Sequence, residues 1–146
     1  MTGLTTNAKE RWKIMFLEQL SDTNKERFVE LAYKLAYSNR DFPEAQQKLL
    51  GRFMKECGIK YIPNTTTREE LIASFADQNE QVRLIVYYEI YMLLISDEEI
   101  DADETKVLGA LRSAFGISEE NAVKIQDQGM LLEQTRHDLE KLLGLE

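Results

Sequence analysis

Cysteine, proline and glycine are all scarce in this chain of 146 residues, which holds one cysteine, two prolines and seven glycines. A single cysteine excludes a disulfide within the chain and is typical of a reducing compartment. Few prolines and glycines leave little material for the tight turns of a strand-rich protein. The opening residues, MTGLTTNAKERW, are polar and lack the apolar region of a signal peptide, so the sequence favours a cytoplasmic protein.

Long hydrophobic runs are missing as well. The most apolar stretch, residues 82–95, has 14 residues and includes Arg83 and Glu89. A membrane-spanning helix needs about 20 predominantly apolar residues. The sequence therefore predicts no membrane span, and it predicts that this stretch is a helix buried in a protein core.

Positive charge and catalytic motifs are also in short supply. The 18 basic side chains are outnumbered by 26 acidic ones, for a net charge of −8. Binding a nucleic-acid backbone needs clustered lysine and arginine, so the composition argues against such a partner. His137 is the only histidine, and the chain has no phosphate loop, nucleophile elbow or HExxH motif. We therefore expect a protein that is not an enzyme, with Cys57 as a core thiol.

Helix signals cover nearly the whole chain. In a capping box, a polar side chain caps an early amide and a glutamate three residues later reaches back. Such boxes start at Asn7, Thr23, Thr67 and Asp101. Ser118 is a simple N-cap, and Gly58 and Gly116 are typical left-handed helix ends. We predict helices over residues 8–20, 24–38, 43–57, 68–77, 80–96, 102–115, 119–128 and 130–143.

An internal repeat is the most informative feature. A shift of 58 positions places LAYKLAYSNRDFPEAQQKLLGRFMKECGI over EIYMLLISDEEIDADETKVLGALRSAFGI without a gap, with eight identities in 29 positions. The identical pairs are Tyr33/Tyr91, Leu35/Leu93, Ser38/Ser96, Lys48/Lys106, Leu50/Leu108, Gly51/Gly109, Gly58/Gly116 and Ile59/Ile117. We predict one repeat over about residues 7–59, a linker over 60–66, a second repeat over about 67–117 and a helical tail over 118–146.

The repeat also predicts the fold class. Two copies are too few for a solenoid, so we expect an all-α single domain over residues 1–146, with seven or eight helices. The two three-helix copies then face each other about a pseudo-twofold axis, with helices 24–38 and 80–96 in the middle. Gly51 and Gly109 lie mid-helix, where glycine costs about 1 kcal/mol relative to alanine. Their matched positions favour the close approach of another backbone at both sites. The alternative is that the glycines arose by sequence drift and are tolerated.

One stretch, LLISDEEIDADETKVLGALRSAFGISEENAVKI, resembles the signature of the TerB-like (tellurite-resistance) family. That signature has an apolar helix, an ADGxI(S/T/D)xxE loop, an amphipathic helix ending in lGls and a further helix. The resemblance covers about residues 84–128, and the first repeat more faintly. It implies an internally duplicated helical domain, linked to stress-response or membrane-associated assemblies, whose clustered acids bind metal. The signature acids correspond to Asp97 and Glu104, whereas Glu98 stands where the family usually has glycine.

The acidic stretch SDEEIDADE, residues 96–104, has two interpretations. An EF-hand is excluded, because counting from Asp97 puts Leu108 where the bidentate glutamate belongs. The first interpretation is structural, with Asp101 capping a helix whose first turn favours acids while the other carboxylates face solvent.

The second interpretation is a cation site. Across the repeat, Asn39 matches Asp97 and Gln46 matches Glu104, so each acid stands opposite its neutral amide. If the copies face each other, these four side chains converge on one polar site. Their oxygen ligands suit Ca²⁺ or Mg²⁺, weakly bound, better than zinc. The alternative is that the first copy lost its acids because it lost the site.

Three functions remain open on the sequence. The favoured one is a non-enzymatic helical interaction module with a protein partner, part of a stress-response assembly if the TerB-like resemblance holds, and either a monomer or a homodimer. The second is a divalent-cation-binding protein whose ion is structural or regulatory. The third, a carboxylate-dependent hydrolase, has no motif in its support.

Overall fold

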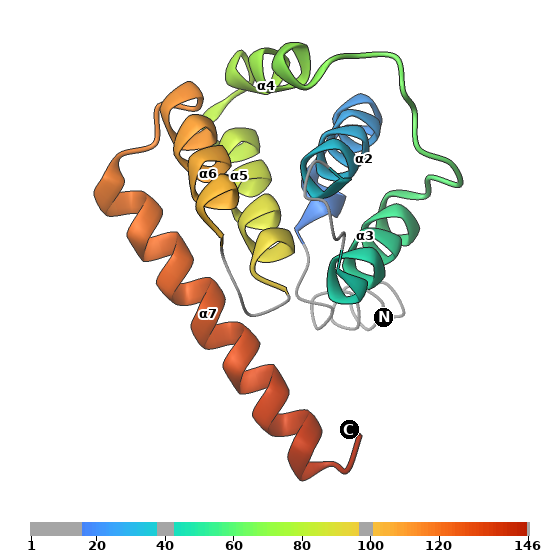
Figure 1. The fold of residues 1–146 in the computed structure, drawn as a ribbon, viewed down its shortest axis with the longest axis vertical. Helices are drawn as coiled ribbons and strands as arrows, with labels where there is room; N and C mark the ends of the chain where they lie inside the picture. Colours follow the sequence, from blue (N-terminus) through green and yellow to red (C-terminus); the bar gives the residue numbers. More distant parts are fainter. Residues whose placement is uncertain (1–15, 38–42, 97–100, 146) are drawn as a thin grey trace, which may run out of the picture.

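The computed structural model describes residues 16–37, 43–96 and 101–145. Within these residues the chain forms six α-helices and one short 3-10 helix and contains no strand, which confirms the predicted all-α class (Figure 1). The elements in chain order are η1 (Leu17–Gln19), α2 (Asp22–Tyr37), α3 (Glu44–Cys57), α4 (Arg68–Ala76), α5 (Glu80–Leu94), α6 (Ala102–Ala114) and α7 (Glu119–Leu142).

Capping interactions begin three of these helices where the sequence predicts them. Asp101 accepts a hydrogen bond from the backbone N–H of Glu104 at 2.8 Å, and the Glu104 carboxylate accepts one from the N–H of Asp101 at 3.2 Å. Thr67 and Ser118 each cap the third amide of their helix at 3.1 Å. These bonds satisfy amides that the helix itself leaves without partners.

The ends of α3 and α6 agree with the sequence, whereas the start of α2 does not. Gly58 and Gly116 adopt left-handed φ angles of 70° and 64° after α3 and α6, as predicted. The predicted cap at Thr23 is wrong, because Ser21 accepts the hydrogen bond from the N–H of Asn24 at 3.2 Å and the helix starts earlier. The hydroxyl oxygen of Ser21, two residues upstream of Thr23, caps an amide in the first turn of the helix in its place.

The N-terminal prediction is tested only in part. The capping box at Asn7 and residues 8–15 lie outside the described residues. The described end of the predicted helix 8–20 is the 3-10 helix η1, which begins after Phe16 and is followed by Leu20 in an extended conformation. The prediction that an α-helix continues to residue 20 is therefore wrong.

Helix α5 lies at the centre of the fold. It contacts α2, α3, α4, α6 and α7, and Figure 1 shows it between α6 and α2. Its fully or nearly fully buried apolar side chains include Val86, Tyr87, Ile90, Leu93 and Leu94. One cluster of buried apolar residues joins all seven described elements. Burial of this most apolar stretch is thus confirmed, and no described helix is long and apolar enough to cross a membrane.

Helix α7 is continuous from Glu119 to Leu142, whereas the sequence predicts a break at Gly129. Gly129 is buried, and a Cβ atom there would lie 3.0 Å from Met92 Sδ and 3.1 Å from Tyr88 Cε1. The glycine therefore does not end the helix. It lets α7 lie close against α5, and this packing outweighs the low helix propensity of glycine.

The close approach expected at Gly51 and Gly109 is absent. Both residues are exposed, and a Cβ atom built at either position meets no atom within 4 Å. The prediction is therefore wrong, and tolerated drift is the remaining explanation for the two glycines. The close glycine contact that the sequence placed at these positions occurs at Gly129 instead.

Alanine at either exposed glycine should stabilise the protein. Gly51→Ala and Gly109→Ala are each expected to raise the free energy of unfolding by about 0.5–1 kcal/mol, because alanine restricts the unfolded chain and has room in the helix. Urea denaturation measures this change. Gly129→Ala is the matched control, since its Cβ displaces Met92 and Tyr88 and the gain should shrink or reverse. Destabilisation by Gly109→Ala would contradict the open environment of this position.

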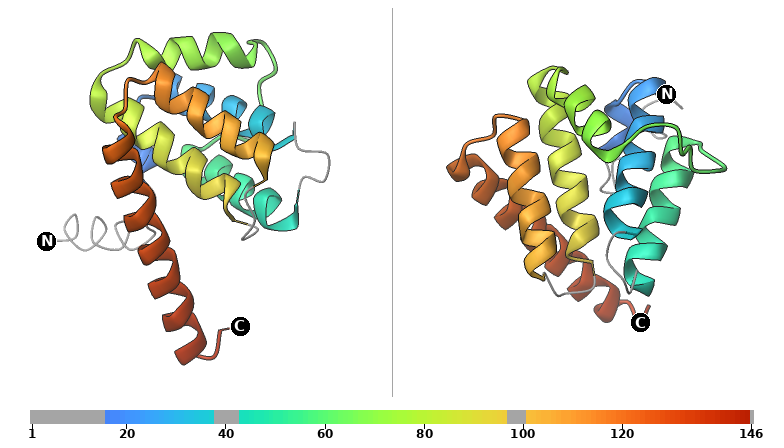
Figure 2. Two further views of the ribbon diagram at one scale, coloured as in Figure 1. Left: turned by 60° about the vertical axis from the view of Figure 1, so that its left-hand side comes forward. Right: turned by 45° about the horizontal axis from the view of Figure 1, so that its top comes forward.

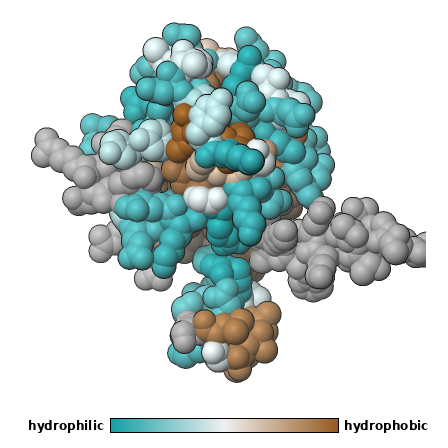
Figure 3. All heavy atoms as spheres, turned by 90° about the vertical axis from the view of Figure 1, so that its right-hand side faces the viewer, coloured by the Kyte–Doolittle hydropathy of each residue, from teal (hydrophilic) through white to brown (hydrophobic). Residues whose placement is uncertain are grey.

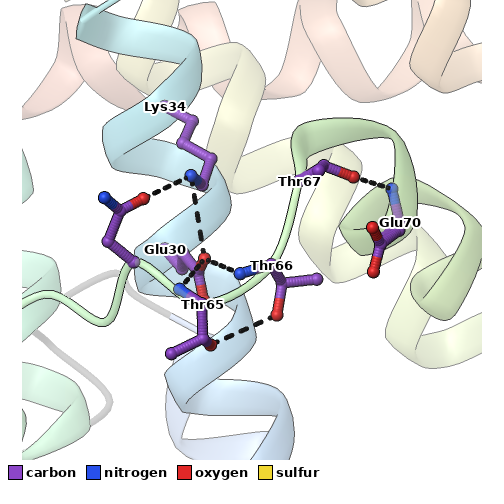
Figure 4. A network of polar contacts seen from close by, with 7 residues as sticks. Glu30, Lys34, Thr65, Thr66, Thr67 and Glu70 are labelled. Atoms are coloured by element: carbon purple, nitrogen blue, oxygen red, sulfur yellow. Dashed lines mark hydrogen bonds and ion pairs between the residues drawn. The ribbon is translucent and has the colours of Figure 1, made fainter.

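The linker between α3 and α4 is held along α2 (Figure 4). Glu30, which is 3% exposed, accepts backbone hydrogen bonds from Thr65 at 3.2 Å and Thr66 at 2.9 Å. Lys34, one turn further along α2, donates to the side-chain oxygen of Asn64 at 2.8 Å. A buried carboxylate with several donors is well stabilised, and these bonds anchor the linker to α2. The linker is non-helical, as predicted.

Candidate functional site

Two of the four predicted metal ligands meet in the structure. Gln46 on α3 and Glu104 on α6 occupy matched positions of the two repeats. The Nε2 atom of Gln46 donates a hydrogen bond to Oε2 of Glu104 at 3.1 Å, and the two residues are 0% and 4% exposed. The other two predicted ligands, Asn39 and Asp97, lie outside the described residues. Gln46 and Glu104 are therefore in contact although they lie 58 positions apart in the sequence.

The Gln46 amide leaves one strong acceptor without a partner. Its Nε2 also lies 3.4 Å from the carbonyl oxygen of Leu94, but its buried Oε1 has no hydrogen-bond partner among the residues that the structure describes. An unpaired buried acceptor costs about 1–3 kcal/mol. Amide and carboxylate oxygens are the ligands that Ca²⁺ and Mg²⁺ prefer. By donor chemistry, Gln46 and Glu104 fit half of the predicted cation site.

The structural interpretation of the acidic stretch is also supported. Asp101 and Glu104 form a reciprocal capping box, and Asp101 and Asp103 are exposed to solvent. Residues 97–100 lie outside the described part. Within the described ranges, no group of three or more His, Cys, Asp or Glu residues could hold a metal ion. Glu104 therefore has an established structural role, whether or not a cation binds beside it.

A groove of about 730 Å³ lies between α3, α5 and α7. Leu49 on α3, Met92 and Ile95 on α5, and Met130 on α7 contribute apolar lining, and Arg52 adds a positive charge. Polar and charged side chains, among them Lys48, Glu133 and Arg136, complete the lining. A concave site of this volume is in the range that binds small ligands or a peptide side chain. The sequence alone did not indicate it, because its walls come from three helices that are far apart in the chain.

Glu89 is a buried carboxylate at the base of this groove. It is 2% exposed and accepts a hydrogen bond from the backbone N–H of Phe16 at 2.8 Å. Burial raises the pKa of Glu89 from its ordinary value of 4.5 to about 7. The hydrogen bond from the Phe16 N–H lowers this pKa, the negative charge of Glu56 raises it and the positive charge of Arg52 lowers it. The available signal in the sequence was a lone glutamate within the most apolar helix.

Cys57 and His137 lie in different environments. Cys57 is half-buried against the core, and burial raises the pKa of its thiol to about 11. A thiol with this pKa is protonated at neutral pH and is a poor nucleophile. His137 is exposed on α7 at the edge of the groove. The predicted core thiol is thus confirmed in part, because Cys57 is half-buried against the core, and the solvated helical position of His137 is confirmed.

The C-terminal part of α7 extends past the other helices (Figure 2). Its exposed leucines are Leu139 (54%), Leu142 (85%), Leu143 (62%) and, just beyond the helix, Leu145 (69%). Figure 3 shows a hydrophobic surface at the tip of this projection. Sequence reasoning did not single out these residues, because a leucine-rich helix end looks the same whether or not it is covered by the core.

No protein-family model matches this chain, and no curated protein or solved structure shows significant similarity to it. The resemblance to the TerB-like family thus rests on the sequence motif alone and stays a prediction.

Proposed function

We propose that the protein is a non-enzymatic helical interaction module that binds a protein partner through the projecting end of α7. The observation that carries this proposal is the exposure of Leu139, Leu142 and Leu143, which follow i, i+3, i+4 spacing. Side chains with this spacing lie on one helical face. Contiguous exposed apolar surface is uncommon on proteins without partners, and an apolar helix face is a frequent docking element.

The charges beside this leucine face favour an apolar partner surface. Arg136 donates hydrogen bonds to Glu133 and Glu140 on the same helix, so the three charges are already paired. A partner therefore needs a groove for the leucines rather than a complementary charged surface. If the TerB-like resemblance holds, the assembly is one of the cytoplasmic stress-response type.

Replacing the leucine face should abolish partner binding without unfolding the protein. In the variant Leu139→Ser/Leu142→Ser/Leu143→Ser, stability should change by no more than about 1 kcal/mol, because each replaced side chain is largely exposed. Affinity capture from cell extract, followed by mass spectrometry, should recover specific proteins with the wild type and lose them with the variant.

The matched control for this experiment is Val123→Ser, which removes a 48% exposed apolar side chain from the same helix away from its tip. It should capture the same proteins as the wild type. Equal capture by all three proteins would show that the tip of α7 is not the interface. If light scattering shows a dimer that the triple variant dissociates, the partner is a second copy of the chain.

A second candidate function, binding of a divalent cation, is favoured by the unpaired Oε1 of Gln46 beside the Glu104 carboxylate. In this proposal the two repeat copies face each other about a pseudo-twofold axis, and Asn39 and Asp97 complete the ligand set with Gln46 and Glu104. The cation, Ca²⁺ or Mg²⁺, neutralises the buried carboxylate and has a structural or regulatory role. Two carboxylates imply an affinity near the millimolar end of known calcium sites.

Calcium should raise the melting temperature of the wild type at concentrations above the dissociation constant. The variant Gln46→Glu should respond more strongly, because it adds a second carboxylate beside Glu104 that only a cation relieves. Asp97→Asn/Glu104→Gln should respond less than the wild type. Potassium chloride at equal ionic strength controls for screening. No response of either the wild type or Gln46→Glu up to about 10 mM calcium would eliminate this candidate.

A further inference from the structure

We propose that the groove between α3, α5 and α7 binds a small amphipathic carboxylate, whose anionic head contacts Arg52 and whose apolar tail lies against α5 and α7. The chemistry of this ligand is that of a medium-chain fatty acid. The inference concerns a surface separate from the leucine face of α7 and does not depend on the proposed function.

One face of α3 supplies a positive wall of the groove. Ala45, Lys48, Leu49 and Arg52 line the groove at i, i+3, i+4 and i+7 spacing, which places them on the same side of the helix. Both charged residues of this wall are basic, although the chain as a whole has a net charge of −8. This local reversal of sign favours an anionic ligand at the α3 wall.

Arg52 is the cation of this wall that a ligand can pair with most readily. Lys48 already lies 3.4 Å from Glu44, and Arg136 on the α7 wall is bonded to Glu133. Arg52 has no hydrogen bond or ion pair within the described part of the chain. Its guanidinium is therefore available to donate two parallel hydrogen bonds to a carboxylate.

The buried carboxyl of Glu89 does not repel such an anion in mildly acidic solution. Glu89 lines the groove but is only 2% exposed, and burial raises its pKa to about 7. Below this pH the carboxyl is mostly protonated and uncharged. The positive charge of Arg52, which lowers the pKa of Glu89 from a distance, is then left without a counter-charge. A titration at about pH 6 is therefore the most sensitive condition for binding.

The other two walls accommodate an apolar tail. Met92 and Ile95 on α5 and Met130 on α7 line the groove, and methionine side chains adapt to the shape of a ligand. The polar lining of α7 includes Glu133 and Arg136, which neutralise each other. A volume of about 730 Å³ lies in the range of small-molecule sites. The positive α3 wall and these apolar side chains thus match the two ends of an amphipathic carboxylate.

Decanoate is the probe for this site. Isothermal titration calorimetry at about pH 6 should give a one-to-one complex with a dissociation constant on the order of 0.1 mM. Decyltrimethylammonium has the same tail and a positive head, so it should bind at least about tenfold more weakly. Butyrate should also bind at least about tenfold more weakly, because it buries about six fewer methylene groups.

Variants of both ends of the site test the placement of the ligand. Arg52→Gln should weaken decanoate binding by about tenfold or more, and Arg52→Lys, which keeps the charge, should give an intermediate affinity. Arg68→Gln, which removes a cation on α4 that does not line the groove, is the matched control. Met130→Gln should weaken binding several-fold. Its exposed neighbour Leu131 does not line the groove, so Leu131→Gln should bind like the wild type.

Arg52 and Met130 are both exposed, so their variants should fold, and circular dichroism with thermal melting checks this. No binding of decanoate up to about 5 mM, or equal binding of decyltrimethylammonium, would overturn the proposal. Affinity that is unchanged in both Arg52→Gln and Met130→Gln would also overturn it. Binding that is lost in the triple serine variant of the leucine face and kept in the groove variants would place the ligand at the tip of α7 instead.

Discussion

Replacing Glu89 by glutamine is expected to raise the free energy of unfolding at pH 8 by up to about 3 kcal/mol. Burial raises the pKa of Glu89 from 4.5 to about 7, so the folded protein pays for ionising this carboxyl when the unfolded chain does not. Glutamine has nearly the same shape, carries no charge, and retains an oxygen that can accept the hydrogen bond from Phe16.

The sign of the pH dependence follows from the proton that Glu89 retains. Below pH 4.5 the carboxyl is protonated in both states and costs nothing. Between pH 4.5 and 7 the unfolded chain releases its proton while the folded protein keeps it, so wild-type stability falls as the pH rises. Above pH 7 both states are ionised and the full cost is present. Wild-type stability should therefore decline through this window, and the Glu89→Gln variant should decline less.

Urea denaturation at pH 5, 6, 7 and 8 measures this difference directly. The variant and the wild type should be closest in stability at pH 5 and diverge towards pH 8. Glu69→Gln, which removes an exposed carboxylate on α4, is the matched control and should keep the wild-type pH profile. Parallel profiles for Glu89→Gln and the wild type would show that Glu89 is ionised at no cost in the folded protein.

Removing the Glu104 side chain is expected to destabilise the protein by about 2–4 kcal/mol. Glu104→Ala deletes one half of the capping box with Asp101 and leaves the buried amide of Gln46 without its acceptor. The volume-conserving variant Gln46→Met should be costly for the complementary reason, because it leaves a buried carboxylate without this donor. The double variant Gln46→Met/Glu104→Met removes both polar groups together.

A double-mutant cycle separates the contact from its surroundings. With Gln46→Met, Glu104→Met and the double variant, the two single changes should cost together at least about 1 kcal/mol more than the double change. Asp103→Ala, the neighbouring exposed acid, is the control and should stay within about 0.5 kcal/mol of wild type. Strict additivity of the two changes would mean that the Gln46–Glu104 hydrogen bond contributes no stability.

The cycle also bears on the cation. If a divalent ion binds beside Gln46 and Glu104, the coupling between them should increase in millimolar calcium, because the ion contacts both oxygens. Unchanged coupling would leave Glu104 with its structural role alone. The calcium dependence of this coupling therefore distinguishes the two interpretations of the acidic stretch, a helix cap and a cation site, at Glu104, the residue that belongs to both.

One contact of the candidate site could be inferred from the matched sequence segments. Matching Gln46 to Glu104 across 58 positions predicted that these two side chains lie near each other as cation ligands, and the structure joins them by a buried hydrogen bond between α3 and α6. The groove and Glu89 were not predicted, since neither a repeat nor a motif records which helices surround a given side chain.

The sequence by itself determined the helical class and most described helix ends. The capping bonds at Asp101 and Ser118 and the left-handed turn at Gly58 each involve residues within one helical turn. Interactions of this range depend on local residue order and hardly at all on the rest of the fold. The burial of α5 was equally evident, because a helix that is apolar on all sides has no stable place in water.

Only the tertiary structure decided what surrounds each helix. Gly109 and Gly129 are both glycines within helices, yet the first is exposed and the second is pressed against α5. The pKa of Glu89 is raised because burial within the fold outweighs the hydrogen bond from the backbone N–H of Phe16, 73 positions away in sequence, which lowers it. The leucines at the end of α7 are exposed because α7 is longer than the body against which it packs. Each outcome depends on contacts between distant segments, and the free energy of such contacts is set by packing and burial rather than by local sequence.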